Sequence, residues 1–219
     1  INGQTHNLYD ILDDGKTVIL DLFATWCGPC WDFAITGVLE DLQSQYPNEV
    51  VCIAVEADPS TPESELYGGG VGDWTTVIDY IMADDPSGDI ATDYALAYYP
   101  TIYKICPDRM VTEVGQLGSV NAFYNEIQSC SQATYSKDMK MMGYNGVNAH
   151  CNGTANPSVM VQNYSLNSNV TSFNVLTFEN GQQLNSTPWT GNLSTYETAT
   201  VSLGEISGLY GTTNLTFEM

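Results

Sequence analysis

The sequence has few basic residues. Five Lys and Arg stand against 26 Asp and Glu in 219 residues, which gives a formal net charge of −21 at pH 7. Such a chain repels phosphate backbones and anionic lipids, which argues against nucleic acids and anionic membrane surfaces as partners. The chain also lacks an apolar run near the roughly 20 residues of a membrane-spanning helix, so we expect no transmembrane segment. Hydrophobic residues are nevertheless 43% of the sequence, which argues against disorder.

The acidic residues are concentrated in the first part of the chain. Up to Cys130 there are 21 acidic and three basic residues, and after it five acidic and two basic. The second part is instead rich in Asn, Ser and Thr. We therefore expect an N-terminal domain over residues 1–130, a linker over 131–156 and a second domain over 157–219.

The N-terminal part contains a strand–helix–strand pattern. Residues 17–24 and 50–55 are nearly continuous apolar runs, typical of strands buried on both faces. Between them, apolar residues from Phe33 to Leu42 recur at helical spacing. This order predicts a parallel pair of strands with a crossover helix.

Two cysteines, Cys27 and Cys30, stand at the turn that enters this helix, with Gly28 and Pro29 between them. A helix N-terminus favours a thiolate over a thiol, and cysteines three residues apart can close a disulfide over one turn. The pattern predicts a redox pair in which Cys27 is the nucleophile and Cys30 resolves the mixed disulfide. A permanent structural disulfide is the alternative. A zinc site would need a second ligand pair that the chain lacks, so we expect no metal.

Four landmarks, in the right order, resemble those of the thioredoxin superfamily. They are Trp26-Cys27-Gly28-Pro29-Cys30, Asp21 six residues before Cys27, Tyr99-Pro100-Thr101, and Val114-Gly115 ahead of the helical stretch 119–130. The resemblance covers roughly residues 8–130 and implies an α/β thioredoxin fold, a central mixed sheet flanked by helices.

The resemblance also implies roles for individual residues. Cys27, Cys30 and Asp21 would be catalytic, with Asp21 as a buried acid that assists proton transfer at Cys30. The substrate, a protein or peptide disulfide or thiol, would contact Trp26, Gly28, Pro29, Tyr99, Pro100, Thr101 and Gly115, with a cis bond before Pro100. No cofactor is implied.

The chain departs from small thioredoxins at three places. Trp31-Asp32 follows the second cysteine, where thioredoxins often carry a cation. No lysine in strand 50–55 is available to pair with Asp21. Residues 59–93 form a long insert, Gly-rich and acidic, which we expect at the rim of the active site. We interpret its acidic residues Asp84, Asp85 and Asp89 as a solvated turn rather than a cation site.

The C-terminal part has the texture of β-structure. Strand-like segments occur at 159–163, 173–178, 199–203 and 214–217, and Asn180-Gly181 is a hairpin signal. Short strands at this spacing predict a small all-β domain, an immunoglobulin- or fibronectin-like sandwich.

The six cysteines leave several pairings open. We expect Cys130 and Cys151 to form a structural disulfide that staples the two domains, with Cys106–Cys130 as the rival pairing. Cys52 lies in a buried-strand pattern and is expected to be a free core thiol.

The whole arrangement also resembles secreted thioredoxin-like proteins of Bacteroidetes that carry a trailing β module and are associated with type IX secretion. Because the chain opens at Ile1 without Met or a basic and apolar leader, we expect that a signal peptide has been removed. The sequence therefore predicts a monomeric thiol-disulfide oxidoreductase that is extracellular, cell-surface or periplasmic. The alternative is an extracellular binding or adhesion protein in which the thioredoxin fold is a scaffold and the disulfide is inert.

Overall fold

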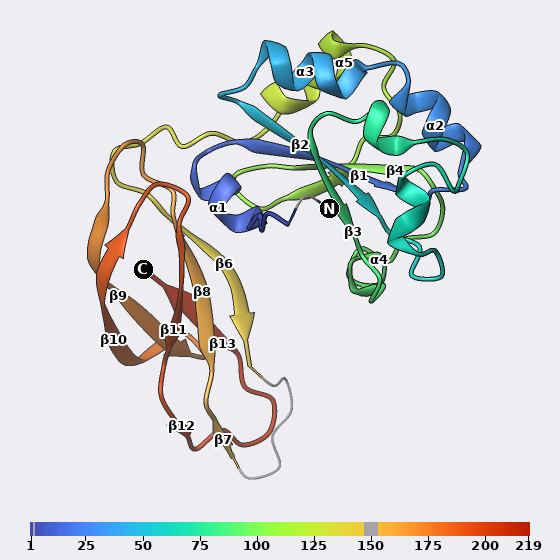
Figure 1. Cartoon of the computed structure of the whole chain (residues 1–219). Helices are drawn as coiled ribbons and strands as arrows, with labels where there is room; N and C mark the ends of the chain where they lie inside the picture. Colours follow the sequence, from blue (N-terminus) through green and yellow to red (C-terminus); the bar gives the residue numbers. More distant parts are fainter. Residues whose placement is uncertain (2, 147–152) are drawn as a thin grey trace. The chain divides into compact units, whose positions relative to one another are not determined.

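The structure is a computed structural model that describes residues 1, 3–146 and 153–219. The chain divides into two compact units, Ile1–Ser131 and Gln132–Met219 (Figure 1). In the part of the chain that the structure describes, no helix is both long and apolar enough to cross a bilayer.

The N-terminal unit is built on a five-stranded mixed sheet in the order β3-β2-β1-β4-β5 (Figure 1). The strands are β1 (Thr17–Phe23), β2 (Val50–Glu56), β3 (Ile81–Asp84), β4 (Thr101–Ile105) and β5 (Val111–Glu113). The first three run parallel, whereas β4 is antiparallel to β1 and β5 to β4. Every residue of β1 is buried, as its continuous apolar sequence predicts for a central strand.

Helices cover both faces of this sheet (Figure 1). One face carries α2 (Gly28–Ala34), α3 (Val38–Gln45) and α5 (Val120–Gln128), whose apolar side chains pack on β1, β2 and β4. The other face carries α1 (Leu8–Asp13) and α4 (Asp89–Asp93). The helical pattern after the cysteines is divided between α2 and α3, because Gly37 has a left-handed backbone with φ +66°. This sheet and its helices confirm the predicted thioredoxin fold.

The insert at 59–93 packs tightly against the rest of the N-terminal unit. It contains the short 3₁₀ helices η1 (Glu63–Leu66) and η2 (Trp74–Thr76), then β3 and α4. A Cβ on Gly70 would lie 2.3 Å from the Thr25 carbonyl oxygen, and one on Gly72 would lie 2.3 Å from the Trp31 ring. Only glycine permits these approaches, so the Gly-rich stretch lies directly against the turn that carries the cysteines.

The expected solvated acidic turn is wrong at Asp85. This side chain is 6% exposed and accepts hydrogen bonds from the Ile90 amide at 2.8 Å and the Ser87 hydroxyl at 2.8 Å. Asp85 therefore organises the turn before α4. The sequence pattern does not distinguish such a buried, hydrogen-bonded aspartate from a solvated one.

The C-terminal unit consists of antiparallel sheets, as predicted. One sheet has the order β11-β8-β6, a second β10-β9-β13, and a short pair β12-β7 completes the unit (Figure 1). Val159, Val161 and Val201 of the first sheet share a core with Val175 of the second, so two apolar faces pack together. The strands are β6 (Met139–Asn145), β7 (Thr154–Ala155), β8 (Ser158–Asn163), β9 (Val170–Glu179), β10 (Gln182–Leu193), β11 (Thr198–Ser202), β12 (Ile206–Ser207) and β13 (Leu215–Glu218).

Part of the expected linker is a strand. Residues 139–145 form β6, which pairs with β8, and Met139 and Met141 pack against the core of the C-terminal unit. A register shift between Met141 and Gly143 interrupts the strand. This irregularity breaks the period-two alternation by which a strand is predicted, so the segment resembled a linker.

The expected disulfide between Cys130 and Cys151 is wrong, because Cys130 is bonded to Cys106, with Cα atoms 5.5 Å apart. Cys106 follows β4 and Cys130 follows α5, which packs on the same sheet. The Nζ atom of Lys104 in β4 donates to Glu126 in α5 at 2.9 Å, which holds the two ends together. Cys151 lies outside the described residues.

Candidate active site

Cys27 and Cys30 form a disulfide at the N-terminus of α2. Their Cα atoms are 5.3 Å apart, and the Cys27 sulfur also accepts a 3.1 Å hydrogen bond from the Cys30 amide. Cys27 thereby caps the helix, and Pro29 occupies a first-turn position where a missing N–H costs nothing. When the disulfide opens, this amide and the helix dipole stabilise a thiolate on Cys27.

A second loop reaches the cysteines through aromatic contacts. The Tyr99–Pro100 peptide bond is cis. The Tyr99 ring meets the Trp26 ring edge to face, with centroids 5.8 Å apart, and Tyr99 also packs against the apolar cluster that holds both cysteines. Thr101 begins β4 with a hydroxyl that donates to the Tyr98 carbonyl at 2.6 Å. The structure thus brings this predicted substrate segment beside the cysteine pair.

Gly28 and Gly115 were also predicted to contact the substrate. Gly28 has nothing within 4 Å of the position of a Cβ, so the space above the turn is open. Gly115 has φ +69°, and the side-chain Nε2 atom of the next residue, Gln116, donates to the Pro29 carbonyl oxygen at 3.1 Å. Gln116 was missed by the sequence analysis. A lone glutamine in a loop carries no pattern that would single it out.

Asp21 is buried in β1 beneath the cysteines. By strand alternation its side chain shares a face with Ile19, which packs on α3, and with Phe23, which packs in the cluster of Cys27 and Cys30. It is 3% exposed, and its Oδ1 atom has no hydrogen-bond partner among the described residues. Burial, and secondarily the charge of Glu40, raises the pKa of Asp21 to about 7.

A group that the sequence analysis missed, Glu56, contacts the active-site turn from the end of β2. It is 1% exposed, and its Oε1 atom accepts hydrogen bonds from the Thr25 amide at 3.4 Å and the Thr61 hydroxyl at 2.6 Å. Burial raises the pKa of Glu56 to about 7, against the opposing effect of these hydrogen bonds. Its position at the end of a strand gave no sequence signal that it would be buried.

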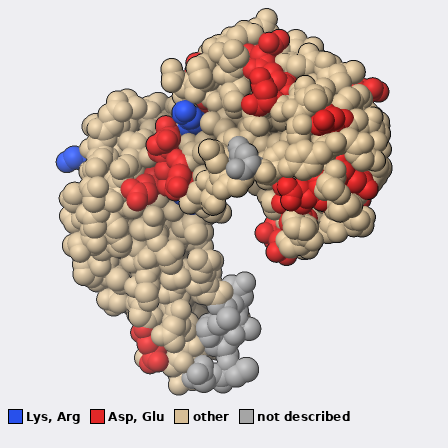
Figure 2. Space-filling model, in the orientation of Figure 1, with Lys and Arg blue, Asp and Glu red and all other residues tan. Residues whose placement is uncertain are grey.

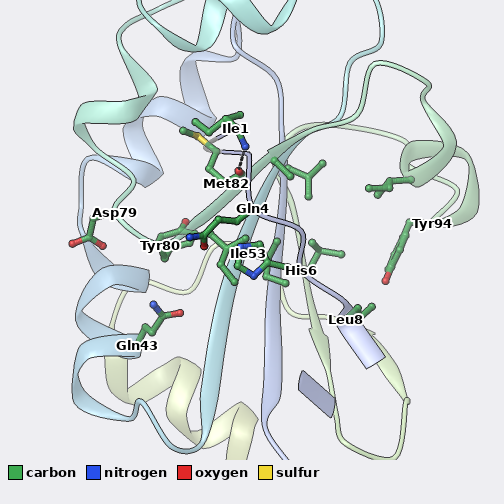
Figure 3. Close-up of a pocket in the computed structure, with 15 residues that line it drawn as sticks. Ile1, Gln4, His6, Leu8, Gln43, Ile53, Asp79, Tyr80, Met82 and Tyr94 are labelled. Atoms are coloured by element: carbon green, nitrogen blue, oxygen red, sulfur yellow. Dashed lines mark hydrogen bonds between the residues drawn. The ribbon is translucent and has the colours of Figure 1, made fainter. Parts of the chain in front are cut away.

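A pocket of about 530 Å³ lies apart from the disulfide. Its wall includes Gln4, Ile53, Asp79, Tyr80 and Met82, which converge on it from the N-terminal segment, β2 and the start of β3 (Figure 3). None of the residues predicted for the redox site lines it. Tyr80 and Met82 also pack against the cluster around Cys27 and Cys30, so side chains fill the space between pocket and disulfide.

The surroundings of the cysteines are acidic. Trp26 donates to Asp58 at 2.8 Å, and the Thr25 hydroxyl donates to Glu65 at 2.8 Å. In the described part of this unit, Lys104 pairs with Glu126, Arg109 pairs with Asp13, and Lys16 donates to the Pro47 carbonyl oxygen. Figure 2 shows acidic side chains across the visible face of the N-terminal unit. Among the described residues, no group of three or more His, Cys, Asp or Glu is arranged to hold a metal ion.

Comparison with known proteins finds similarity to thioredoxins and thiol-disulfide oxidoreductases. The Thioredoxin family model matches residues 3–68. The thioredoxin-like protein YneN of Bacillus subtilis is 32% identical over 114 residues, which are 52% of this chain and 63% of that protein. The thiol-disulfide oxidoreductase ResA of Oceanobacillus iheyensis is 26% identical over 132 residues, 58% of this chain and 64% of that protein. The chain thus spans less than two thirds of the length of each of these relatives.

Solved structures match a similar share of the chain. The exposed lipoprotein thioredoxin Etrx1 of Streptococcus pneumoniae is 21% identical, with a TM-score of 0.45, over 58% of this chain and 93% of that one. The thioredoxin domain of a thiol-disulfide oxidoreductase from Bacteroides vulgatus is 18% identical, with a TM-score of 0.44, over 58% of this chain and 86% of that one.

Proposed function

We propose that the N-terminal unit, which belongs to the thioredoxin superfamily, catalyses thiol–disulfide exchange on protein substrates through Cys27 and Cys30. The observation that carries the proposal is the pair itself: a disulfide at a helix N-terminus, with the cis Tyr99–Pro100 peptide packed beside it. We further propose that the motif Cys-Gly-Pro-Cys is the redox centre and that the protein acts outside the cytoplasm.

The reaction begins when the reduced protein meets a substrate disulfide. The Cys27 thiolate attacks one substrate sulfur, a Cys27–substrate disulfide forms, and the other substrate sulfur leaves as a thiolate. Cys30 then loses its proton, and its thiolate attacks the Cys27 sulfur. The second substrate thiolate departs and the Cys27–Cys30 disulfide forms. Two electrons pass from the protein to the substrate, whose two thiolates take protons from solvent.

Asp21 supplies the base for the second step. Its carboxylate accepts the Cys30 proton, directly or through one water molecule. A carboxyl whose pKa is about 7 is present in both protonation states near neutral pH, which suits it to accept and release a proton in each cycle.

The substrate chain is bound by the rim of the turn. Trp26 is 54% exposed, and Gly28 leaves open space above the turn. Pro100 and Thr101 position the backbone of the substrate, with Tyr99 and Gly115 at its edges. Because acidic side chains surround this rim, substrates with basic residues beside their disulfide bind best.

The experiment is insulin reduction followed by turbidity, with dithiothreitol as the electron donor. We expect turnover by the wild-type chain and none by Cys27→Ser. Cys30→Ser should instead trap a mixed disulfide that is visible on a non-reducing gel. A redox titration against glutathione buffers supplies the potential of the pair.

A scaffold function is the competing possibility. In that case the Cys27–Cys30 disulfide would resist reduction, and wild type and Cys27→Ser would both be inactive. The C-terminal unit, which we propose to be an immunoglobulin-like module for attachment or partner binding, would then carry the biological activity. Absence of wild-type turnover together with a potential far below that of thioredoxin would decide for the scaffold.

A further inference from the structure

Two carboxyl groups, one buried and one half-buried, meet where the parallel strands β2 and β3 end. Glu56 and Asp84 are register partners on these strands. The Oε2 atom of Glu56 and the Oδ1 atom of Asp84 are both buried, and neither has a hydrogen-bond partner in the described part of the chain. Once one of the two carboxyls carries a proton, it can donate to the other, because the side chains lie within hydrogen-bonding reach.

The environment of this pair favours a shared proton. Two carboxylates held together in a poorly solvated site cannot both ionise without a large electrostatic cost. Burial raises the pKa of Glu56 to about 7, and the charge of Asp84 adds to this effect. Burial likewise raises the pKa of Asp84, with Glu63 adding to the shift.

Few other charged groups face the pair. Asp85 faces Asp84 as a further negative charge, whereas the amino group of Ile1 opposes the shift of Asp84. On the side of Glu56, the groups are the Thr25 amide, the Thr61 hydroxyl and the backbone of Asp58. The Tyr99 phenol also faces Glu56, whose charge helps to raise the pKa of Tyr99. No cationic side chain contributes to either carboxyl.

The pair is connected to the redox turn through one residue. Thr25 is fully buried and stands two positions before Cys27. Its amide donates to Glu56 Oε1 at 3.4 Å, and its carbonyl oxygen accepts from the Val71 amide at 3.0 Å and the Trp74 indole at 3.3 Å. Of the groups that hold the Thr25 backbone, Glu56 is thus the one that carries a carboxyl, while the Thr25 hydroxyl donates to a second carboxylate, Glu65, at 2.8 Å.

We propose that Glu56 is a positioning residue of the redox turn, and that the Glu56–Asp84 pair conveys its protonation state to Cys27 through the Thr25 amide. The effect on catalysis rests on the proposed function. The coupling between the carboxyl pair and Thr25 exists whether or not the protein turns over a substrate. When the shared proton leaves, the pair gains a second negative charge, and Glu56 becomes a stronger acceptor for Thr25. The added charge also disfavours the Cys27 thiolate.

The coupling is tested on the oxidised full chain, in which Cys27 and Cys30 do not titrate. The measurement is the amide ¹H–¹⁵N chemical shift of Thr25 between pH 5 and 9. We expect a titration with its midpoint near 7 in the wild type and its loss in Glu56→Gln, where the amide oxygen still accepts from Thr25. Asp21→Asn is the matched control, because it removes the other buried carboxyl that titrates near 7, and it should retain the Thr25 titration.

A second measurement follows the consequence for Cys27. The alkylation rate of the reduced proteins with iodoacetamide is recorded from pH 5 to 9. The wild-type profile should deviate near pH 7 from a single thiol titration, and Glu56→Gln should remove the deviation and react severalfold faster at pH 8. Retention of the Thr25 titration in Glu56→Gln, or an unchanged alkylation profile, would overturn the inference. Failure of the proposed function would appear separately, as absence of insulin turnover with the Thr25 titration intact.

Discussion

The indole nitrogen of Trp26 donates a 2.8 Å hydrogen bond to the carboxylate of Asp58. The contact fixes a ring that is 54% exposed and lies one residue before Cys27. Hydrogen bonds from Ser60, and also from Trp26, lower the pKa of Asp58, so the carboxylate keeps its charge well below neutral pH. The orientation of Trp26 is therefore set independently of the groups that titrate near pH 7.

Removal of this contact should weaken substrate binding more than folding. Because the pair is partly solvated, we expect Asp58→Ala to lower kcat/KM for insulin about three- to fivefold, or roughly 1 kcal/mol. Asp58→Asn retains an acceptor oxygen and should stay near the wild-type value. Equal kcat/KM for Asp58→Ala and the wild type would show that the Trp26 orientation does not matter to the substrate.

The second prediction concerns Asp21 and stability. Since the folded-state pKa of Asp21 is raised to about 7 from 3.8, the folded protein holds this proton more tightly than the unfolded chain. The free energy of unfolding therefore falls as pH rises from about 4 to 7. The destabilisation caused by the buried Asp21 carboxylate is fully present above pH 7. Asp21→Asn removes this destabilisation and should raise the free energy of unfolding by about 4 kcal/mol at pH 8, and by roughly 40% of that at pH 5.

Urea unfolding of the oxidised proteins at the two pH values checks this prediction. Asp41→Asn, an exposed acid on α3, is the control and should show no such pH-dependent gain. If Asp21→Asn gained the same stability at pH 5 and pH 8, titration of Asp21 would not be the cause. The same variant should slow the resolution of the mixed disulfide if Asp21 accepts the Cys30 proton.

The third prediction concerns the disulfide between Cys106 and Cys130, which are 24 residues apart. A loop of this length stabilises the folded state by about 3.5 kcal/mol in the chain-entropy model. We expect the double variant Cys106→Ser, Cys130→Ser to lose about that much and to keep insulin turnover below its unfolding temperature. Peptide mapping should recover a Cys106–Cys130 peptide, and Cys151→Ser should leave the N-terminal unit as stable as before. A Cys130–Cys151 peptide in the map would contradict the pairing.

The fold of the N-terminal unit could be predicted where local pattern and burial agree. The apolar run at 17–24 became β1 (Thr17–Phe23), and the run at 50–55 became β2 (Val50–Glu56). The division of one helical pattern into α2 and α3 was not predicted, because the pattern reports which face is apolar and not the left-handed backbone of Gly37.

The site was predictable only where a motif marks it. Cys27, Cys30 and Asp21 lie in recognisable positions of the sequence; the two cysteines share one apolar cluster with Phe23, which lies on the same face of β1 as Asp21. Glu56 could not be found in this way, because its burial arises from the strand beside it and from the insert that covers it. The pairing of Cys130 likewise depends on where α5 meets β4, which is a tertiary relation that spacing along the chain does not encode.

The last prediction concerns the charge of the substrate. In the described part of residues 1–131, Lys104 and Arg109 are in ion pairs and Lys16 donates to the Pro47 carbonyl oxygen, while Asp58 and Glu65 adjoin the cysteine turn. Disulfide peptides with flanking lysines should therefore be reduced faster than peptides with flanking glutamates at low ionic strength.

The dependence of the two rates on salt distinguishes a preference for substrate charge from a preference for substrate shape. The Debye length falls from about 30 Å at 0.01 M to about 8 Å at 0.15 M ionic strength, so the two rates should converge as salt is added. Most of the change should appear in the second-order rate constant, because electrostatic attraction acts on encounter. Matched peptides that differ only in the flanking charges supply the comparison, and a neutral peptide gives the baseline. A rate ratio that stays constant from 0.01 M to 0.5 M salt would mean that the acidic rim does not select the substrate.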